Sequence, residues 1–237
     1  LAMVPFADEP MTVVAENCAR EWQIDTQAQH DVALRRFEQY GDAIKDNHAF
    51  QRRYMTLPFD VPDQKFHKTA TTLTGDEGIP QTSAEKLSKL KPVIPGGTVT
   101  YGGQTRPADG NAAIVVTTAD KARELSRDRN IRVRLLSFGQ ARTRLKMMPH
   151  APVPAARAAL AAAGLKIGDI KAIKSHNPFA VNDIVFAKET GVDVMAMNNY
   201  GCSLVWGHPN GPTGMRLVIE LIEELVLRGG GYGLMHG

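Results

Sequence analysis

A histidine in a loop rich in glycine and proline is the strongest chemical signal in this sequence. His208 lies within residues 198–214, NNYGCSLVWGHPNGPTG, just before an apolar pattern of helical period. Free N–H groups and a positive partial charge are found at a helix N-terminus. A neutral imidazole there can donate to a developing oxyanion or help to activate a nucleophile. A turn histidine bonded to backbone is the alternative interpretation.

A second histidine comes where a predicted strand gives way to a predicted helix. His176 lies within residues 175–183, SHNPFAVND, after the apolar run IKAIKS. In α/β sheets, ligands collect outside the carboxyl ends of the strands. His176 is therefore the second candidate residue, and a helix-cap histidine bonded to backbone is its alternative interpretation.

The elements that must position these residues alternate between strand and helix patterns. Period-2 and continuous apolar runs predict strands at 112–118, 133–138, 170–175, 192–197 and 232–235. Helical patterns cover 11–22, 26–44, 120–126, 153–164, 179–191 and 215–228, whereas residues 46–106 are predicted to be irregular. This alternation predicts a layered α/β domain. No GxGxxG follows a strand, so a dinucleotide-binding fold is the weaker choice.

Composition excludes several classes of protein. The 237 residues are 43% hydrophobic and 22% charged, which is typical of a globular protein. A net charge of +3 does not indicate a nucleic-acid partner, and no apolar run reaches the roughly 18 residues of a membrane span. No histidine or carboxylate spacing suggests a metal site. The opening LAMVPFADEP does not start with Met, which suggests processing, a fragment or missing preceding residues.

The remaining cysteines and histidines point to structural roles. Cys18 and Cys202 lie far apart and form no CxxC, which argues against a disulfide framework and fits a reducing cytoplasm. Cys18 falls on an apolar helical stripe, so we expect a buried small hydrophobe rather than a nucleophile. We expect three other histidines to be solvated: His30, His48 and His67.

The loop around His208 and the helix after it resemble a known signature. GHPNGPTGMRLVIELIEELVLRGGGYGL is similar to the C-terminal motif of the thiolase superfamily, GHP-x-G-x-(S/T)-G followed by an apolar helix and RG-x-YGL. MTVVAENCA at 11–19 and GDEGIPQTSAEKLSKLKPVIPGGTVTYGGQT at 75–105 resemble other thiolase segments. HNPF at 176–179 is similar to the NEAF of most members and to the HDCF of the sterol-carrier-protein type. The resemblance covers residues 11–237 and corresponds to the second half of a thiolase.

The resemblance implies roles for individual residues. His208 and His176 take catalytic positions around the thioester. Pro178 stands where the sterol-carrier type has a cysteine, and Cys202 aligns with a family glycine. Nothing in this chain matches the nucleophilic cysteine of the family. The residues that the resemblance places on coenzyme A or the acyl group are Ile94, Tyr101, Gln104, Thr105, Met148, Pro178 and Phe179.

The resemblance also implies an activity. The chain would be the C-terminal portion of an acyl-CoA acyltransferase that carries out 3-oxoacyl-CoA thiolysis or the reversible Claisen condensation. Coenzyme A is then a substrate, no cofactor is implied, and the nucleophilic cysteine comes from outside this chain. The expected partner is a complementary N-terminal thiolase half or subunit, in a dimer or tetramer. The alternative is a non-catalytic thiolase-like subunit that binds acyl-CoA or scaffolds a partner.

The expected fold is a thiolase-type layered α/β domain with helices around a mixed sheet, preceded by an irregular, partly helical loop domain. We expect residues 1–106 to form a loop (lid) segment. Residues 107–127 would be the last strand and helix of the N-terminal thiolase domain, and residues 128–237 the C-terminal thiolase domain.

Overall fold

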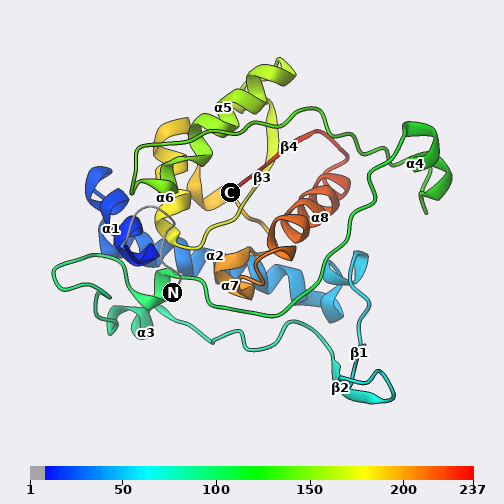
Figure 1. Ribbon diagram of the computed structural model, residues 1–237, viewed down its shortest axis with the longest axis horizontal. Helices are drawn as coiled ribbons and strands as arrows, with labels where there is room; N and C mark the ends of the chain where they lie inside the picture. The colour runs from blue at the N-terminus through cyan, green and yellow to red at the C-terminus, as the bar shows by residue number, and fades with distance from the viewer. Residues whose placement is uncertain (1–8) are drawn as a thin grey trace.

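A pair of parallel strands lies at the centre of the protein. The computed structural model describes residues 9–237, so the prediction about the first residues of the chain lies largely outside the described range. β3 (Ile170–Ser175) pairs in parallel with β4 (Tyr232–His236), and helices surround the pair (Figure 1). The mixed α/β architecture predicted from the alternating pattern is confirmed, with both of these strands where the sequence predicts them.

The two faces of this strand pair are covered by different helices. α8 (Pro212–Leu227) covers one face, and a Cβ on Gly233 of β4 would lie 2.9 Å from side-chain carbons of Leu221 and Leu225. Only glycine allows the helix to come so close. The other face packs on α5 (Pro152–Ala163) and α6 (Ala180–Thr190). The buried residues of that second cluster are Val153, Ala156, Phe186, Met197 and Leu234.

The helices α5 and α6 end where the sequence predicts. Gly164 and Gly191 follow them with φ values of 67° and 76°, the left-handed conformation that glycine adopts without steric cost. Shorter elements connect these helices and strands. They include a 3₁₀ turn at Met148–His150 before α5, another at Ile167–Asp169 before β3, and α7 (Ser203–Trp206) before α8.

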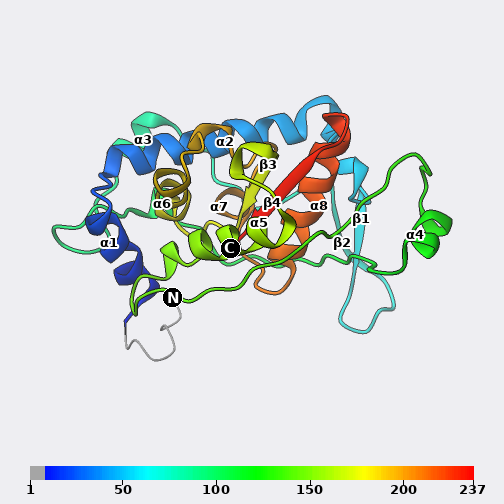
Figure 2. The same cartoon turned by 90° about the horizontal axis from the view of Figure 1, so that it is seen from above.

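Two N-terminal helices cover the remaining side of the core. α1 (Met11–Glu21) leads into α2 (Thr26–His48), which runs along the top of the molecule in Figure 2. The N-cap of α2 is Asp25, whose carboxylate accepts the Ala28 N–H at 2.7 Å. The expected exposure of His30 is wrong, because its ring is buried and hydrogen-bonded to the Thr100 hydroxyl at 2.8 Å.

α2 is held to α6 by a buried ion pair. Arg36 Nε lies 3.0 Å from Asp183 Oδ2, and both side chains are 0% exposed. Arg36 also donates to the carbonyl oxygens of Val194 and Met197, at 2.6 and 2.9 Å, and to the Gln39 side chain. The guanidinium therefore makes four hydrogen bonds to protein acceptors, which compensate the burial of its charge.

The loop region contains short elements and is fastened to the core at Asp76. β1 (Phe59–Pro62) and β2 (Thr69–Leu73) form an antiparallel hairpin, and α3 (Ala84–Ser88) follows. The Asp76 carboxylate accepts two hydrogen bonds from Arg216 of α8, at 2.6 and 2.7 Å. Tyr40 and Gln51 donate to the same carboxylate. Segments far apart in the sequence are thus joined at one partly buried carboxylate.

Two of the predicted strands are wrong. Residues 112–118 and 133–138 are extended, but within the described range none of their backbone groups is hydrogen-bonded to another strand. Val115 is 77% exposed and Leu135 is 83% exposed. α4 (Ala119–Leu125), between them, stands away from the body of the protein in Figures 1 and 2 and buries no residue. A β-branched run forms a strand only where a partner is available to pair with it.

The predicted strand at 192–197 is also wrong, for a different reason. Val194–Ala196 forms a 3₁₀ turn, begun by the Asp193 side chain accepting the Met195 N–H at 2.9 Å. The carbonyl groups that a strand would use are taken by the side chains of Arg36 and Gln39.

No helix in residues 9–237 is both long and apolar enough to cross a membrane.

Candidate active site

The first histidine of the site is positioned by the ends of the two central strands. His176 follows β3 directly, and its backbone N–H donates to the carbonyl oxygen of His236, the last residue of β4, at 2.8 Å. The imidazole therefore lies outside the carboxyl ends of the strands, where the sequence predicted a ligand-binding edge.

The second histidine is positioned by the loop before α8. Gly207 ends α7 with a φ of 96°, and a Cβ there would lie 2.7 Å from the Ala108 Cβ. The next residue, His208, donates its backbone N–H to the carbonyl oxygen of Arg106 at 2.8 Å. Glycine at 207 is thus required both by its conformation and by the close passage of the segment around Ala108.

The two imidazoles lie against each other. Their ring centroids are 4.3 Å apart, with 31° between the ring planes. Nδ1 of His176 is hydrogen-bonded to the Ser203 hydroxyl at 3.0 Å, and Nδ1 of His208 to the Thr213 hydroxyl at 2.7 Å. Each ring therefore has one nitrogen engaged by a buried hydroxyl and leaves Nε2 available for other contacts.

Both rings are neutral at physiological pH. Burial, and then the neighbouring His208, lower the pKa of His176 from 6.5 to about 4. Burial also lowers the pKa of His208. Neutral imidazoles can each present either a donor or an acceptor at Nε2, which suits proton transfer and the binding of a developing oxyanion.

These low pKa values predict acid sensitivity of the fold. Burial lowers the pKa of His236 to about 4, like that of His176. The unfolded chain takes up these protons near pH 6.5 and the folded chain only near pH 4, so stability present above pH 6.5 is lost as the pH falls towards 4. Each group should remove about 3 kcal/mol from the free energy of unfolding.

Urea unfolding at a series of pH values measures this loss. His176→Asn should flatten the profile, whereas His67→Asn, at an exposed position, should leave it unchanged. A free energy of unfolding that stays constant between pH 7 and pH 4 would show that the buried rings titrate normally.

Four of the residues predicted to line the substrate lie next to His176. Gln104 forms a backbone bridge with Phe179, and Thr105 donates its N–H to the carbonyl oxygen of Pro178 at 2.8 Å. The Thr105 hydroxyl donates to the carbonyl oxygen of Ser203. The side chain of Phe179 is buried at 1% exposure. The loop region and the HNPF turn are thus joined along one short ladder.

The other three predicted residues have no described hydrogen bond to this ladder. Tyr101 is 67% exposed and begins a 3₁₀ turn that packs on α3, where a Cβ on Gly102 would clash with Leu87 Cδ2. Ile94 lies in a turn closed by the Gly97 N–H. Met148 is 42% exposed at the start of its own 3₁₀ turn.

Neither cysteine of the sequence is a ready nucleophile. Burial raises the pKa of Cys18 to about 12 and that of Cys202 to about 11. Both thiols are buried and free. The prediction that Cys18 is a buried small residue is confirmed, and a thiolate nucleophile does not form readily at either position.

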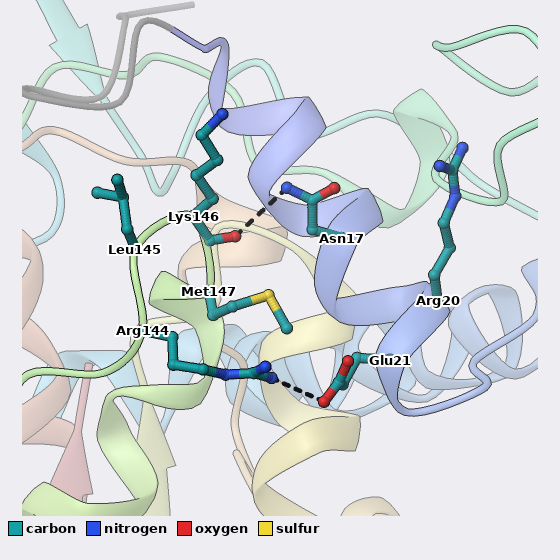
Figure 3. Close-up of a pocket in the computed structure, with 7 residues that line it drawn as sticks. All are labelled: Asn17, Arg20, Glu21, Arg144, Leu145, Lys146 and Met147. Atoms are coloured by element: carbon teal, nitrogen blue, oxygen red, sulfur yellow. Dashed lines mark hydrogen bonds and ion pairs between the residues drawn. The ribbon is translucent and has the colours of Figure 1, made fainter.

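A depression of about 530 Å³ lies elsewhere on the surface, between α1 and residues 144–147 (Figure 3). Arg144 crosses its mouth to pair with Glu21 at 2.7 Å, and Asn17 donates to the carbonyl oxygen of Lys146. It includes neither histidine of the site.

Within residues 9–237, no group of His, Cys, Asp and Glu side chains is arranged to hold a metal ion.

Sequence reasoning missed the hydroxyl residues that hold the two rings. Thr213 lies five residues after His208, and Ser203 is the first residue of α7, 27 residues after His176. Asn177 was also missed, although its amide is buried and bonded on both sides. Two of them carried a signal, because Thr213 is the (S/T) position of the GHP-x-G-x-(S/T)-G motif and Asn177 directly follows His176. Ser203 carried none, because it comes from a separate segment of the chain.

Comparison with known proteins gives a consistent result. The family description "Thiolase, N-terminal domain" matches residues 2–120, and "Thiolase, C-terminal domain" matches residues 129–236. Peroxisomal 3-ketoacyl-CoA thiolase A of Mus musculus is 32% identical over 222 residues, 93% of this chain and 52% of the relative. Beta-ketothiolase BktB of Cupriavidus necator is 31% identical, over 98% of this chain and 57% of the relative.

Solved structures agree with these sequence matches. The Bacillus anthracis acetyl-CoA acetyltransferase superposes with a TM-score of 0.85 at 29% identity, covering 98% of this chain and 58% of that one. Human mitochondrial 3-ketoacyl-CoA thiolase in complex with CoA superposes with a TM-score of 0.81 at 28% identity, covering 98% and 56%. The chain spans about half the length of the relatives that it matches.

Proposed function

Since this chain belongs to the thiolase family, we propose that it is the C-terminal portion of a thiolase-like acyl-CoA acyltransferase. The observation that carries the proposal is the pair of neutral imidazoles, 4.3 Å apart at the strand ends, with both Nδ1 atoms engaged. A site of this kind suits thiolysis of a 3-oxoacyl-CoA or the reverse Claisen condensation. Coenzyme A is a substrate, and no further cofactor is needed.

The proposed reaction passes through an acyl-enzyme. A cysteine thiolate from outside this chain attacks the 3-oxo carbonyl, and the bond between the α- and β-carbons breaks. The enolate of the released acyl-CoA takes up a proton, and the thiol of coenzyme A then receives the acyl group. His208 takes the proton of the attacking cysteine. His208 and His176, or a water that His176 orients, stabilise the thioester oxyanion and the enolate oxygen.

The partner of this chain is a complementary N-terminal thiolase half or subunit. Two observations support it: neither cysteine of the chain is an accessible thiol, and residues 112–118 and 133–138 have unpaired backbone in the described structure. A complementary half would supply both the thiol and the strand partners. We further propose a dimeric or tetrameric assembly, located in the cytoplasm. The division of the chain at residues 106 and 127 also stays a prediction.

A non-catalytic thiolase-like subunit that binds acyl-CoA or scaffolds a partner is the second candidate. The absence of an accessible thiol favours it, since such a subunit needs no nucleophile. The buried hydroxyl partners of His176 and His208 favour the enzyme, because a scaffold has no use for two adjacent imidazoles that are each held by a hydroxyl.

Complementation separates the two candidates. The 237-residue chain alone should not cleave acetoacetyl-CoA, whereas mixing it with an N-terminal thiolase half that carries a reactive cysteine should give turnover. Chromatographic detection of released acetyl-CoA measures turnover by the chain alone and by the mixture. The matched control is the same half with its cysteine replaced by serine.

Cleavage by the chain alone would disprove the external nucleophile. A stable complex that has no turnover in either direction would favour the non-catalytic subunit.

Coenzyme A should slow amide exchange between Tyr101 and Thr105 in the assembled protein. The resemblance places the pantetheine arm there, and the Thr105 N–H already contacts the HNPF turn. Hydrogen exchange followed by mass spectrometry should show protection with coenzyme A but not with adenosine 3′,5′-bisphosphate, which lacks the arm. The hairpin β1–β2 is the internal control. Equal exchange with and without saturating coenzyme A would place the arm elsewhere.

A further inference from the structure

The Ser203 hydroxyl lies between the catalytic-site histidine and a buried amide. Ser203 is 0% exposed at the start of α7. Its Oγ lies 3.0 Å from His176 Nδ1, 3.1 Å from the Asn177 backbone nitrogen and 3.1 Å from Asn177 Oδ1. One hydroxyl thus contacts three polar atoms of the turn between β3 and α6.

The side-chain amide of Asn177 has a fixed orientation. Its Nδ2 donates to Asp183 Oδ2 at 2.8 Å, and a carboxylate can only accept. Its Oδ1 accepts the backbone N–H of Leu204 at 3.1 Å. Oδ1 therefore faces Ser203 as an acceptor, and Asp183 Oδ2 lies 3.0 Å from Arg36 Nε.

The single proton of the Ser203 hydroxyl determines which of the remaining contacts are hydrogen bonds. A hydroxyl has one proton and two acceptor positions. The Asn177 N–H can only donate, so it occupies one acceptor position of Ser203 Oγ. When the Ser203 proton is donated to Asn177 Oδ1, the second acceptor position faces His176 Nδ1, and all three contacts are hydrogen bonds. When the proton is donated to His176 instead, the contact with Asn177 Oδ1 has no hydrogen.

The first arrangement also directs every donor towards the buried negative charge. His176 Nδ1–H donates to Ser203, Ser203 to Asn177, and Asn177 to Asp183. Hydrogen bonds aligned in one direction polarise one another and strengthen the chain. A carboxylate at the end of such a chain stabilises the tautomer whose proton points towards it, as it does when it contacts an imidazole directly.

We propose that Ser203 and Asn177 connect Asp183 to His176 and hold that histidine as its Nδ1–H tautomer, so that Nε2 presents a lone pair. Ser203 is then a positioning residue. His176 then acts as a hydrogen-bond acceptor at Nε2. It can stabilise an oxyanion only through a water molecule that donates one proton to Nε2 and the other to the oxyanion. This consequence for catalysis rests on the proposed function, but the tautomer itself does not.

Long-range ¹H–¹⁵N correlation spectra of the ¹⁵N-histidine-labelled 237-residue chain test the tautomer directly. At pH 7.5 the His176 signal, assigned by its loss in His176→Asn, should show a protonated Nδ1 and an unprotonated Nε2. Ser203→Ala should lose this single pattern and shift His176 towards the Nε2–H tautomer that free histidine prefers. Thr213→Val is the matched control, because it removes the hydroxyl from the other ring and should leave the His176 pattern unchanged.

Each outcome decides the question. A protonated Nε2 on His176 in the unsubstituted chain overturns the proposal, whether or not Ser203→Ala folds. An unchanged pattern in a folded Ser203→Ala chain overturns the role of Ser203. Failure of the proposed function would instead appear as absent turnover on complementation, with the spectra unaffected.

Discussion

Replacing His208 with alanine in the complemented enzyme should lower kcat by more than the loss of one oxyanion donor does. Removal of one such donor typically costs about 10² to 10³ in kcat, or 3 to 4 kcal/mol. His208 is proposed both to activate the thiol and to bind the oxyanion, so its removal takes away two contributions. Steady-state thiolysis of acetoacetyl-CoA measures the effect.

Variants of the adjacent ring provide the control. His176→Asn should retain more activity than His176→Ala, because an asparagine amide can still orient a water molecule for the oxyanion. If both histidines were only turn residues, the variants would lose melting temperature and keep kcat in the folded fraction. If His208→Ala retains more than about a tenth of kcat, equivalent to a loss of only 1.4 kcal/mol, the catalytic role is wrong and the binding subunit is favoured.

Replacing Arg36 with methionine should lower the free energy of unfolding by about 3 to 5 kcal/mol. The substitution leaves the Asp183 carboxylate buried without its cation and removes the donors to the carbonyl groups of Val194 and Met197. Leaving a charge uncompensated in the interior is costly, whereas the intact pair need not be stabilising on balance. Urea denaturation of the 237-residue chain measures the change.

The neighbouring arginine is a matched control for this effect. Arg35 has a side chain that is 38% exposed and pairs with Glu38 at 3.2 Å, so Arg35→Met should cost less than about 1 kcal/mol. Arg36→Met combined with Asp183→Asn should recover part of the loss, because the unpaired charge is removed as well. Equal costs for Arg35→Met and Arg36→Met would show that burial of the ion pair has no energetic consequence.

The part of the fold that local sequence determines was predictable. The helices that end at Gly164 and Gly191, the strands around Ile173 and Leu234, and the loop before α8 carry their own stop signals and periodicity. His176 and His208 were found from these boundaries, since both follow elements whose ends the sequence marks. The thiolase resemblance is confirmed by family matches that span most of the chain.

The parts that failed depend on partners distant in the sequence. α2 buries Arg36 and Gln39, because polar acceptors on α6 and the following turn face them. It also buries Gln29, whose side chain donates to the Thr98 hydroxyl. The apolar side chain of Ile44, on the same helix, is by contrast 39% exposed. Polar residues on a buried helix face have the same spacing in the sequence as polar residues on an exposed face, so only the tertiary contacts distinguish the two cases. Ser203 escaped notice for the same reason.

The unpaired extended segments also determine how the isolated chain should behave in solution. Residues 111–118, NAAIVVTT, contain no charge and no proline, which is the composition of an aggregation-prone strand. Residues 131–138, IRVRLLSF, carry Arg132 and Arg134 among exposed apolar side chains, and like charges of this kind oppose stacking between copies. The first segment is therefore where self-association of the isolated chain should begin. Solubility of this chain in cells would then depend on how quickly it meets a complementary half.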